Sequence, residues 1–210
     1  LTVLTNEAND SVECLTFEDL YGLVGPESEG VANWSDAKDK GATSDLPDAP
    51  LEIFAPGTES GTYDSFYELA IEGLAEENGA PEDVQIRPDY GGLANDNEIV
   101  SGMQSVDTSF GWVGFAFAEE AEGVREIEVD GGDGCVAPSA ETVSDGTYPL
   151  ARPLFIYVNN EKLANNQALS DFVDFYLSDE GMAAVPEVGY VSLADADLEA
   201  TRSTWESAKS

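Results

Sequence analysis

Two glycines and three hydroxyl side chains lie close together in the segment GTESGT, residues 57–62. Gly57 and Gly61 would let the backbone approach a bound group closely, and Ser and Thr hydroxyls donate hydrogen bonds. The apolar run LEIFA before the segment predicts a strand, and the residues after it predict a helix that Ser60 or Thr62 would cap. Amide N–H groups and a positive helix dipole attract oxyanions at such a position. The segment therefore serves as a helix cap or as an anion site, and its chemistry alone leaves both open.

Three better-known motifs resemble this loop, and none of them fits it. A P-loop requires Lys after its second glycine, where this sequence has Thr62. The dinucleotide-binding pattern G-x-G-x-x-G is also absent from the loop. A nucleophile elbow has the form G-x-S-x-G, whereas residues 57–61 read G-T-E-S-G, and the chain has no histidine to activate Ser60. Neither nucleotide hydrolysis nor serine hydrolase chemistry is expected.

The helix after the loop is the clearest element in the sequence. Its apolar positions recur at spacings of three and four residues, namely Tyr63, Phe66, Tyr67, Ala70, Ile71 and Leu74. Asn78 and Gly79, followed by Pro81, predict its end. Such a stripe faces a hydrophobic core.

Strands and helices alternate along the chain, which favours an α/β fold with a mostly parallel sheet. Strands are predicted at residues 1–5, 51–55, 84–90, 125–130 and 154–158, and SFGWVGFAFAEEA begins as a strand and continues into a helix. Other helices are predicted at residues 16–24 and 95–105, with a last one at about 165–177, and residues 26–37 are expected to form a loop. Trp34, Trp112, Phe115 and Phe117 have apolar neighbours and are predicted to lie in the core.

The charge balance excludes several classes of partner. The chain has 43 acidic and 8 basic residues and no histidine, which gives a net charge of -35. Nucleic acids and anionic membranes need a basic surface that is lacking here. Without histidine, neither a Ser-His-Asp triad nor a histidine-based zinc site can form. Dispersed Asp and Glu with few Lys predict a halophilic surface, because concentrated salt shortens the Debye length to about 3 Å at 1 M and screens self-repulsion.

Two cysteines, Cys14 and Cys135, lie in the polar, turn-like segments SVECLT and GGDGCVAP. An even number of cysteines in such surroundings favours one disulfide between distant segments, in an oxidising, extracytoplasmic compartment. Two unpaired buried thiols are the alternative. Acidic pairs such as Glu119 and Glu120 lack the spacing of a calcium loop and are read as solvated surface, so no metal site is predicted.

Longer segments, in order along nearly the whole chain, resemble the substrate-binding protein of phosphate ABC transporters. They include PGTESGTYDSF, ANDNEIVSGMQSVDTSFGWVGFAFAEE and FVDFYLSDEGMAAVPEVGYVSL. The resemblance implies a periplasmic-binding-protein type II fold, in which two lobes with mixed sheets hold inorganic phosphate between them and deliver it to a membrane permease. It implies Ser60, Gly61 and Thr62 as phosphate ligands through backbone N–H and hydroxyl groups. Neither catalysis nor a cofactor is implied.

The chain departs from this family in two respects. The family normally has an earlier segment with a second glycine- and serine-rich helix start, so the first lobe is expected to be incomplete and that segment to be a partner. Some members also place an arginine just before the Ser-Gly-Thr triplet, where this chain has Ala55, Pro56 and Gly57. Arg152 is the candidate for that role within the chain, and an ordinary interlobe or surface ion pair is the alternative. Thr58 and Asn97 are weaker candidates, and helix capping is the alternative for Asn97.

The resemblance also predicts how the chain is divided. Residues 6–148 form the second lobe with the Ser-Gly-Thr loop, and residues 1–5 and 149–210 supply crossover strands and the C-terminal part of the first lobe. We expect an extracytoplasmic, cell-surface-associated phosphate binder rather than an enzyme, with weak binding by this chain alone. A related oxyanion such as sulfate, and reuse of the fold as a surface or assembly protein, stay open as alternatives.

Overall fold

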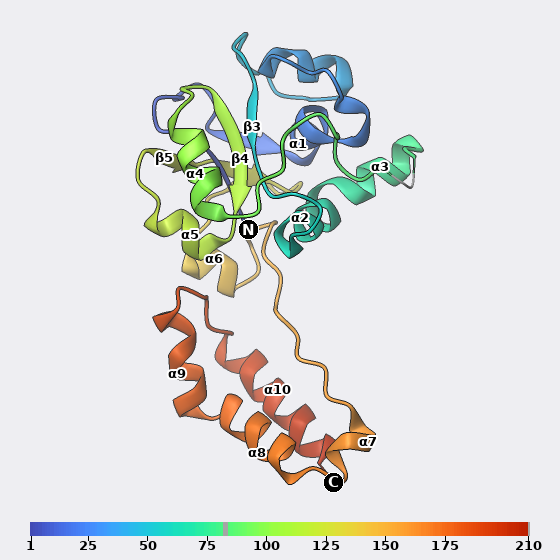
Figure 1. Cartoon of the computed structure of the whole chain (residues 1–210), viewed down its shortest axis with the longest axis vertical. Coiled ribbons are helices and arrows are strands. Elements are labelled where there is room, and N and C mark those ends of the chain that lie inside the picture. The colour runs from blue at the N-terminus through green and yellow to red at the C-terminus, as the bar shows by residue number, and fades with distance from the viewer. Residues whose placement is uncertain (82–83, 210) are drawn as a thin grey trace.

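The computed structural model describes residues 1–81 and 84–209. Residues 1–150 form a body around a mixed four-stranded sheet with the order β3-β4-β1-β5 (Figure 1). Its strands are β1 (Thr2–Asn6), β3 (Glu52–Phe54), β4 (Ser109–Val113) and β5 (Val124–Glu126). β1 is antiparallel to both β4 and β5, whereas β3 and β4 are parallel. The expectation of a mostly parallel sheet is therefore wrong, because apolar runs in the sequence do not encode strand direction.

A second, three-stranded sheet consists of β2 (Cys14–Thr16), β6 (Glu128–Asp130) and β7 (Cys135–Val136). The central strand, β6, is parallel to β2 and antiparallel to β7. The single strand predicted at 125–130 serves both sheets, because the chain passes from β5 to β6 at the fully buried Ile127. Cys14 and Cys135 form the disulfide that the sequence favours, and it joins β2 to β7.

Helices pack around both sheets. α1 (Phe17–Val24) begins at Thr16, as predicted, and α4 (Asp96–Gln104) is capped by Asn95 rather than Asp96. α5 (Phe115–Glu120) follows β4 directly, and α6 (Ala140–Ser144) comes shortly before the end of the body. The segment expected to be a loop contains two short 3-10 helices, η1 (Pro26–Ser28) and η2 (Trp34–Lys40).

Aromatic side chains fill the core of the body. Trp34 and Trp112 are fully buried, as predicted. Phe66 stacks on Trp112 with ring centroids 4.1 Å apart, and Phe110 meets Trp34 edge to face at 5.5 Å. The prediction is wrong for Phe117, which is 46% exposed because α5 turns only Ala118 fully inward. Aromatic pairs of this kind contribute about 0.5–1.5 kcal/mol beyond their burial.

Two predicted strands do not form. Residues 84–90 make an irregular loop, and the backbone N–H of Arg87 donates to the carbonyl of Val24 at 3.0 Å instead of joining a ladder. Residues 154–158 are extended but pair with no strand of the described chain. Leu154, Phe155 and Tyr157 of that run are 70%, 68% and 92% exposed. A strand-forming sequence needs a neighbouring strand, and neither segment has one here.

The C-terminal part of the chain is helical and lies below the body in Figure 1. The extended residues 151–159 lead to α7 (Asn160–Leu163), α8 (Gln167–Tyr176), α9 (Asp179–Glu187) and α10 (Asp195–Ala208). Val173, Leu177 and Trp205 form a small core of their own. The predicted last helix is α8, and sequence reasoning missed the two after it. Within residues 1–81 and 84–209, none of the helices has both the length and the apolar character needed to cross a bilayer.

Candidate anion-binding site

The loop at residues 57–60 leads into a long, anchored helix. α2 (Gly61–Phe66) continues through a π-helical turn, η3 (Tyr67–Ile71), into α3 (Glu72–Asn78). The predicted apolar stripe is mostly buried, with Phe66 packed on Trp112, and Gly79 ends the helix in the left-handed region at φ 68°. Because one face is held in the core, the first turn of α2 has a fixed position at the surface of the body.

Ser60 is the N-cap of α2. Its hydroxyl oxygen accepts a hydrogen bond from the backbone N–H of Thr62 at 3.1 Å, and its own N–H donates to the carbonyl of Gly57 at 3.0 Å. The Ser65 hydroxyl donates to the Gly61 carbonyl at 2.7 Å and closes the first turn. Capping is therefore present, and it occupies one of the amides that an anion could use.

The other donors of the first turn remain open. Among the described residues, the backbone N–H groups of Gly61 and Tyr63 and the hydroxyl of Thr62 have no hydrogen-bond acceptor. Gly61 is exposed and Thr62 is half-buried. These groups gather at the positive end of a helix, which is the arrangement that binds a small oxyanion.

A second chain segment presses against the loop. The backbone N–H of Leu93 donates to the carbonyl of Ala55 at 2.9 Å, and the Tyr90 hydroxyl donates to the carbonyl of Pro56 at 2.8 Å. A Cβ atom at Gly92 would lie only 2.6 Å from the Cα of Gly57. Glycine at position 92 therefore lets the two backbones touch, and this contact fixes the path of the loop.

A pocket of about 530 Å³ opens beside the loop. It is lined by Gly57, Thr58, Glu59, Tyr63, Val84, Gln85, Ile86, Arg87, Pro88, Tyr90 and Gly92. The pocket thus joins the glycine- and hydroxyl-bearing loop to the irregular segment 84–92. Thr58, a weaker candidate ligand, is among the lining residues.

Arg87 forms one wall of this pocket and is only 6% exposed. Its guanidinium donates to both oxygens of Asp89, at 2.5 and 2.6 Å, and to the carbonyls of Leu23 and Val31. The hydrogen bonds from Arg87 lower the pKa of Asp89 to about 2, with a further contribution from the Gly30 N–H. Sequence reasoning missed this residue, although the spacing Arg-Pro-Asp could have suggested a local ion pair.

Glu59 brings a negative charge into the same loop. Its carboxylate folds back over Gly57, so that a Cβ there would lie 2.5 Å from Glu59 Oε2. The side chain is exposed and lines the pocket. A carboxylate at this position opposes anion binding at the start of α2, although water and salt screen it.

Neither Arg152 nor Asn97 is among the residues that line the pocket beside the loop. Arg152 is exposed and lies near the amino group of Leu1, whose pKa burial and the Arg152 charge lower to about 6. In the described part of the chain its guanidinium has no ion-pair partner. The backbone N–H of Asn97 donates to Asn95 Oδ1 at 2.9 Å, so Asn97 belongs to the cap of α4. The loop therefore presents Ser60, Gly61 and Thr62 without a cationic partner from these candidates.

Residues 1–180 match the sequence family described as a PBP superfamily domain. The chain belongs to this superfamily. Protein SphX of Synechocystis sp. is 39% identical over 198 residues, which cover 93% of this chain and 54% of SphX. The phosphate-binding protein PstS of Staphylococcus saprophyticus is 30% identical over 202 residues, which cover 94% of this chain and 56% of PstS.

A solved structure supports the same assignment to the PBP superfamily. It is that of a possible phosphate binding protein from Planctomyces limnophilus, with a TM-score of 0.78 and 31% identity, and the match covers 100% of this chain and 69% of that one. The expected α/β periplasmic-binding-protein fold with mixed sheets is confirmed. The chain spans about half the length of the curated relatives it matches.

Proposed function

We propose that this PBP superfamily chain binds inorganic phosphate through Ser60, Gly61 and Thr62. The observation that carries the proposal is the set of unused donors at the start of α2, namely the Gly61 and Tyr63 amides and the Thr62 hydroxyl. Each charge-assisted hydrogen bond from such a group contributes about 1.5–3 kcal/mol. The names of PstS and of the Planctomyces limnophilus protein support phosphate over other oxyanions.

The proposed role is capture and delivery rather than chemistry. The chain has no histidine to act as a general base, and its relative PstS is named as a phosphate-binding protein. Phosphate held between two lobes would pass to the permease of an ABC importer. The disulfide between Cys14 and Cys135 supports an extracytoplasmic location, and association with the cell surface is part of the same proposal.

We further propose that residues 149–210 belong to a first lobe that another segment completes. Residues 6–148 would form the second lobe, with residues 1–5 as the crossover strand that runs into its sheet. The exposed apolar side chains of Leu154, Phe155 and Tyr157 support this division, because a strand-forming run of this kind is stable only when paired and covered. Phe172 and Phe175 of α8 are also exposed, at 62% and 56%.

Amide chemical shifts test the proposed ligands directly. In a ¹⁵N-labelled chain titrated with sodium phosphate at constant ionic strength, we expect the Gly61 and Tyr63 N–H signals to move first. The Gly79 signal, at the far end of the helix, is the internal control. Weak binding is expected because the open donors come from a single helix start and the Glu59 carboxylate lies in the same loop. The site would be refuted if the Gly61 and Tyr63 amide shifts changed no more than the Gly79 shift.

The main alternative is reuse of the fold as a surface or assembly protein, and the uncovered apolar surface is what favours it. That reading predicts self-association or partner capture through residues 154–158 with no response of the Gly61 amide to phosphate. The same labelled sample therefore separates the two functions. Sulfate, titrated in parallel, distinguishes phosphate from a general oxyanion site.

A further inference from the structure

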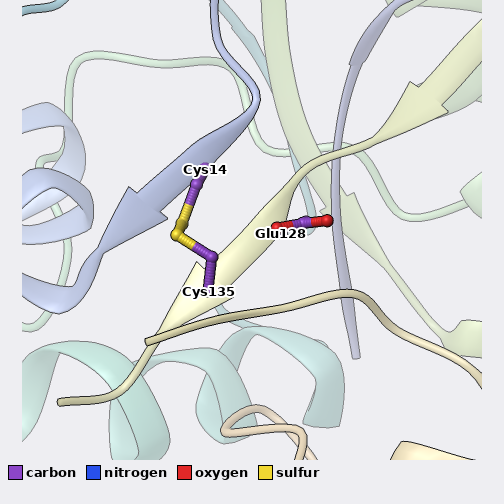
Figure 2. Close-up of side chains that lie close together, drawn as sticks. All are labelled: Cys14, Glu128 and Cys135. Carbon is purple, nitrogen blue, oxygen red and sulfur yellow. A yellow bond between two sulfur atoms is a disulfide. The ribbon is translucent and has the colours of Figure 1, made fainter. Parts of the chain in front are cut away.

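Three potential metal ligands meet across the small sheet, two from its outer strands β2 and β7 and one from its central strand β6. Figure 2 shows the disulfide between Cys14 and Cys135 with the side chain of Glu128 beside it. Both sulfur atoms and a carboxylate oxygen of Glu128 lie within 4.8 Å of one another, and all three residues reach the surface. The Glu128 carboxylate has no hydrogen-bond or ion-pair partner in the described chain. It is therefore available to a ligand.

We propose that reduction of this disulfide creates a site for one zinc ion, or another thiophilic divalent ion, held by Cys14, Cys135 and Glu128. A dithiol reductant supplies two electrons and two protons, so that the S–S bond breaks and two thiols form while the dithiol becomes a disulfide. Zinc then replaces the two thiol protons, which leave to solvent, and binds two thiolates and one carboxylate. The fourth position of a tetrahedral zinc ion is left for water.

The geometry of the oxidised form is close to what zinc requires. Two thiolate ligands at about 2.3 Å from a tetrahedral zinc ion lie roughly 3.8 Å apart. The two sulfur atoms can separate to this distance once the S–S bond is broken. The Cα atoms, 6.0 Å apart, need not move far for this change. The Glu128 oxygen lies within 4.8 Å of both sulfurs, so it has to approach by no more than about 1.3 Å.

The sheet holds these positions without help from the disulfide. Cys14 is aligned with Glu128 in the parallel pairing of β2 and β6, and Cys135 is aligned with Asp130 in the antiparallel pairing of β6 and β7. Leu15 and Val129, next to the ligands, are fully buried and anchor β2 and β6 in the core. The ligands therefore remain near one another after reduction.

Charge favours a cation at this point. Two thiolates and a carboxylate in one place repel one another, and a divalent ion removes that repulsion. No basic side chain forms an ion pair with Glu128 in the described residues, and the whole chain carries a net charge of -35. In the oxidised protein both sulfur atoms are used in the S–S bond, so the site exists only in the reduced state. The same strands would be joined by the disulfide or by the metal.

Zinc titration calorimetry of the oxidised and reduced full chain tests this proposal, with the reductant removed anaerobically before titration. We expect one zinc ion per chain in the reduced protein and no comparable binding in the oxidised one. Glu128→Gln should weaken zinc binding by at least about tenfold, since even loss of a supporting partner costs 10- to 100-fold. Glu13→Gln is the matched control. It also removes one negative charge, and Glu13 precedes Cys14 in the chain but is not one of the three proposed ligands.

Cobalt provides a second, spectroscopic readout of the same site. A sulfur-to-cobalt charge-transfer band should appear in the reduced chain and be lost in Cys14→Ser/Cys135→Ser, whereas Glu128→Gln should change the d–d bands that report coordination number. Equal zinc affinity of Glu128→Gln and Glu13→Gln would overturn the assignment of Glu128. Equal binding by oxidised and reduced protein would overturn the whole site.

Discussion

Asp19 and Ser44 join the start of α1 to a loop 25 positions later in the sequence. Asp19 Oδ1 accepts the backbone N–H of Ser44 at 2.9 Å, and Oδ2 accepts its hydroxyl at 2.5 Å. The same carboxylate accepts the N–H groups of Thr16 and Thr43. Burial opposes ionisation, but the hydrogen bonds from Ser44, Thr16 and Thr43 outweigh it and lower the pKa of Asp19. One acidic residue therefore satisfies donors from two separate segments.

Asp19→Ala should lower the free energy of unfolding by about 1–3 kcal/mol, because it leaves partly buried donors of two segments unpaired. Urea unfolding followed by circular dichroism measures this loss. Asp39→Ala, at an exposed position of η2, is the control and should change stability by less than about 0.5 kcal/mol. Equal effects of the two substitutions would contradict the role given to Asp19.

The Asp89 carboxylate predicts a dependence of stability on pH. Its folded-state pKa of about 2 lies below the ordinary value of about 3.9, so its contribution is present above pH 4 and is lost as the pH falls toward 2. Asp89→Asn should remove part of the acid-induced loss seen between about pH 4 and about pH 2. Asp179→Asn is the control, since that carboxylate is 97% exposed. The measurement is urea unfolding across this range, and identical slopes in wild type and Asp89→Asn would contradict the prediction.

Gly92→Ala should disturb the loop at residues 57–60, because the new Cβ would lie 2.6 Å from the Cα of Gly57. We expect a loss of about 1–3 kcal/mol in unfolding free energy, which is typical of overpacking, and altered amide shifts at Gly57 and Gly61. Gly91→Ala is the matched control, since a Cβ there meets nothing within 4 Å. The contact between the two backbones is not important if both variants behave alike.

Glu59→Gln should strengthen phosphate binding. The carboxylate lies in the loop that leads to the donors of α2, and its removal takes away a like charge worth up to about 1 kcal/mol at low salt. Glu68→Gln, exposed later on the same helix, is the control for total charge. Phosphate titrations by NMR at low and high ionic strength provide the measurement. The gain should shrink as salt increases, and a gain that does not depend on salt would point to a change in loop structure instead.

The net charge of -35 predicts that salt stabilises the chain. Raising KCl from about 0.1 M to about 1 M shortens the Debye length from about 10 Å to about 3 Å and screens the repulsion between acidic side chains. Thermal unfolding should therefore shift to higher temperature over this range. Tetramethylammonium chloride, compared at equal ionic strength, distinguishes general screening from specific cation binding. No shift in either salt would contradict a halophilic surface.

Local patterns predicted the elements that local interactions form. The stripe from Tyr63 to Leu74 and the cap at Ser60 depend on residues within a few positions of one another, and both are present in the structure. The wall formed by Arg87 could not be predicted in this way, because its carbonyl partners at Leu23 and Val31 lie 64 and 56 positions away. The requirement for glycine at position 92 likewise arises from a distant segment of backbone.

Strand predictions failed where a partner decides the outcome. Residues 154–158 have a strongly strand-forming sequence, yet no neighbouring strand of the described chain pairs with them. The run 125–130 was correctly placed, but its division between two sheets at Ile127 depends on the packing of the whole body. α9 and α10 were missed because Ala, Asp and Ser in these segments weaken the apolar periodicity.

The bond between Cys14 and Cys135 closes a covalent ring of residues 14–135, which contains the loop at residues 57–60 and the whole of α2. The four C-terminal helices, α7 to α10, lie outside that ring. Residues 151–159, most of which are exposed, connect them to the body. After a cut in residues 151–159, only non-covalent contacts, such as the hydrogen bond from the Ser144 hydroxyl to the Ser192 carbonyl, would hold the helical fragment to the body. A cut within the ring would leave both pieces joined until a reducing agent opens the disulfide.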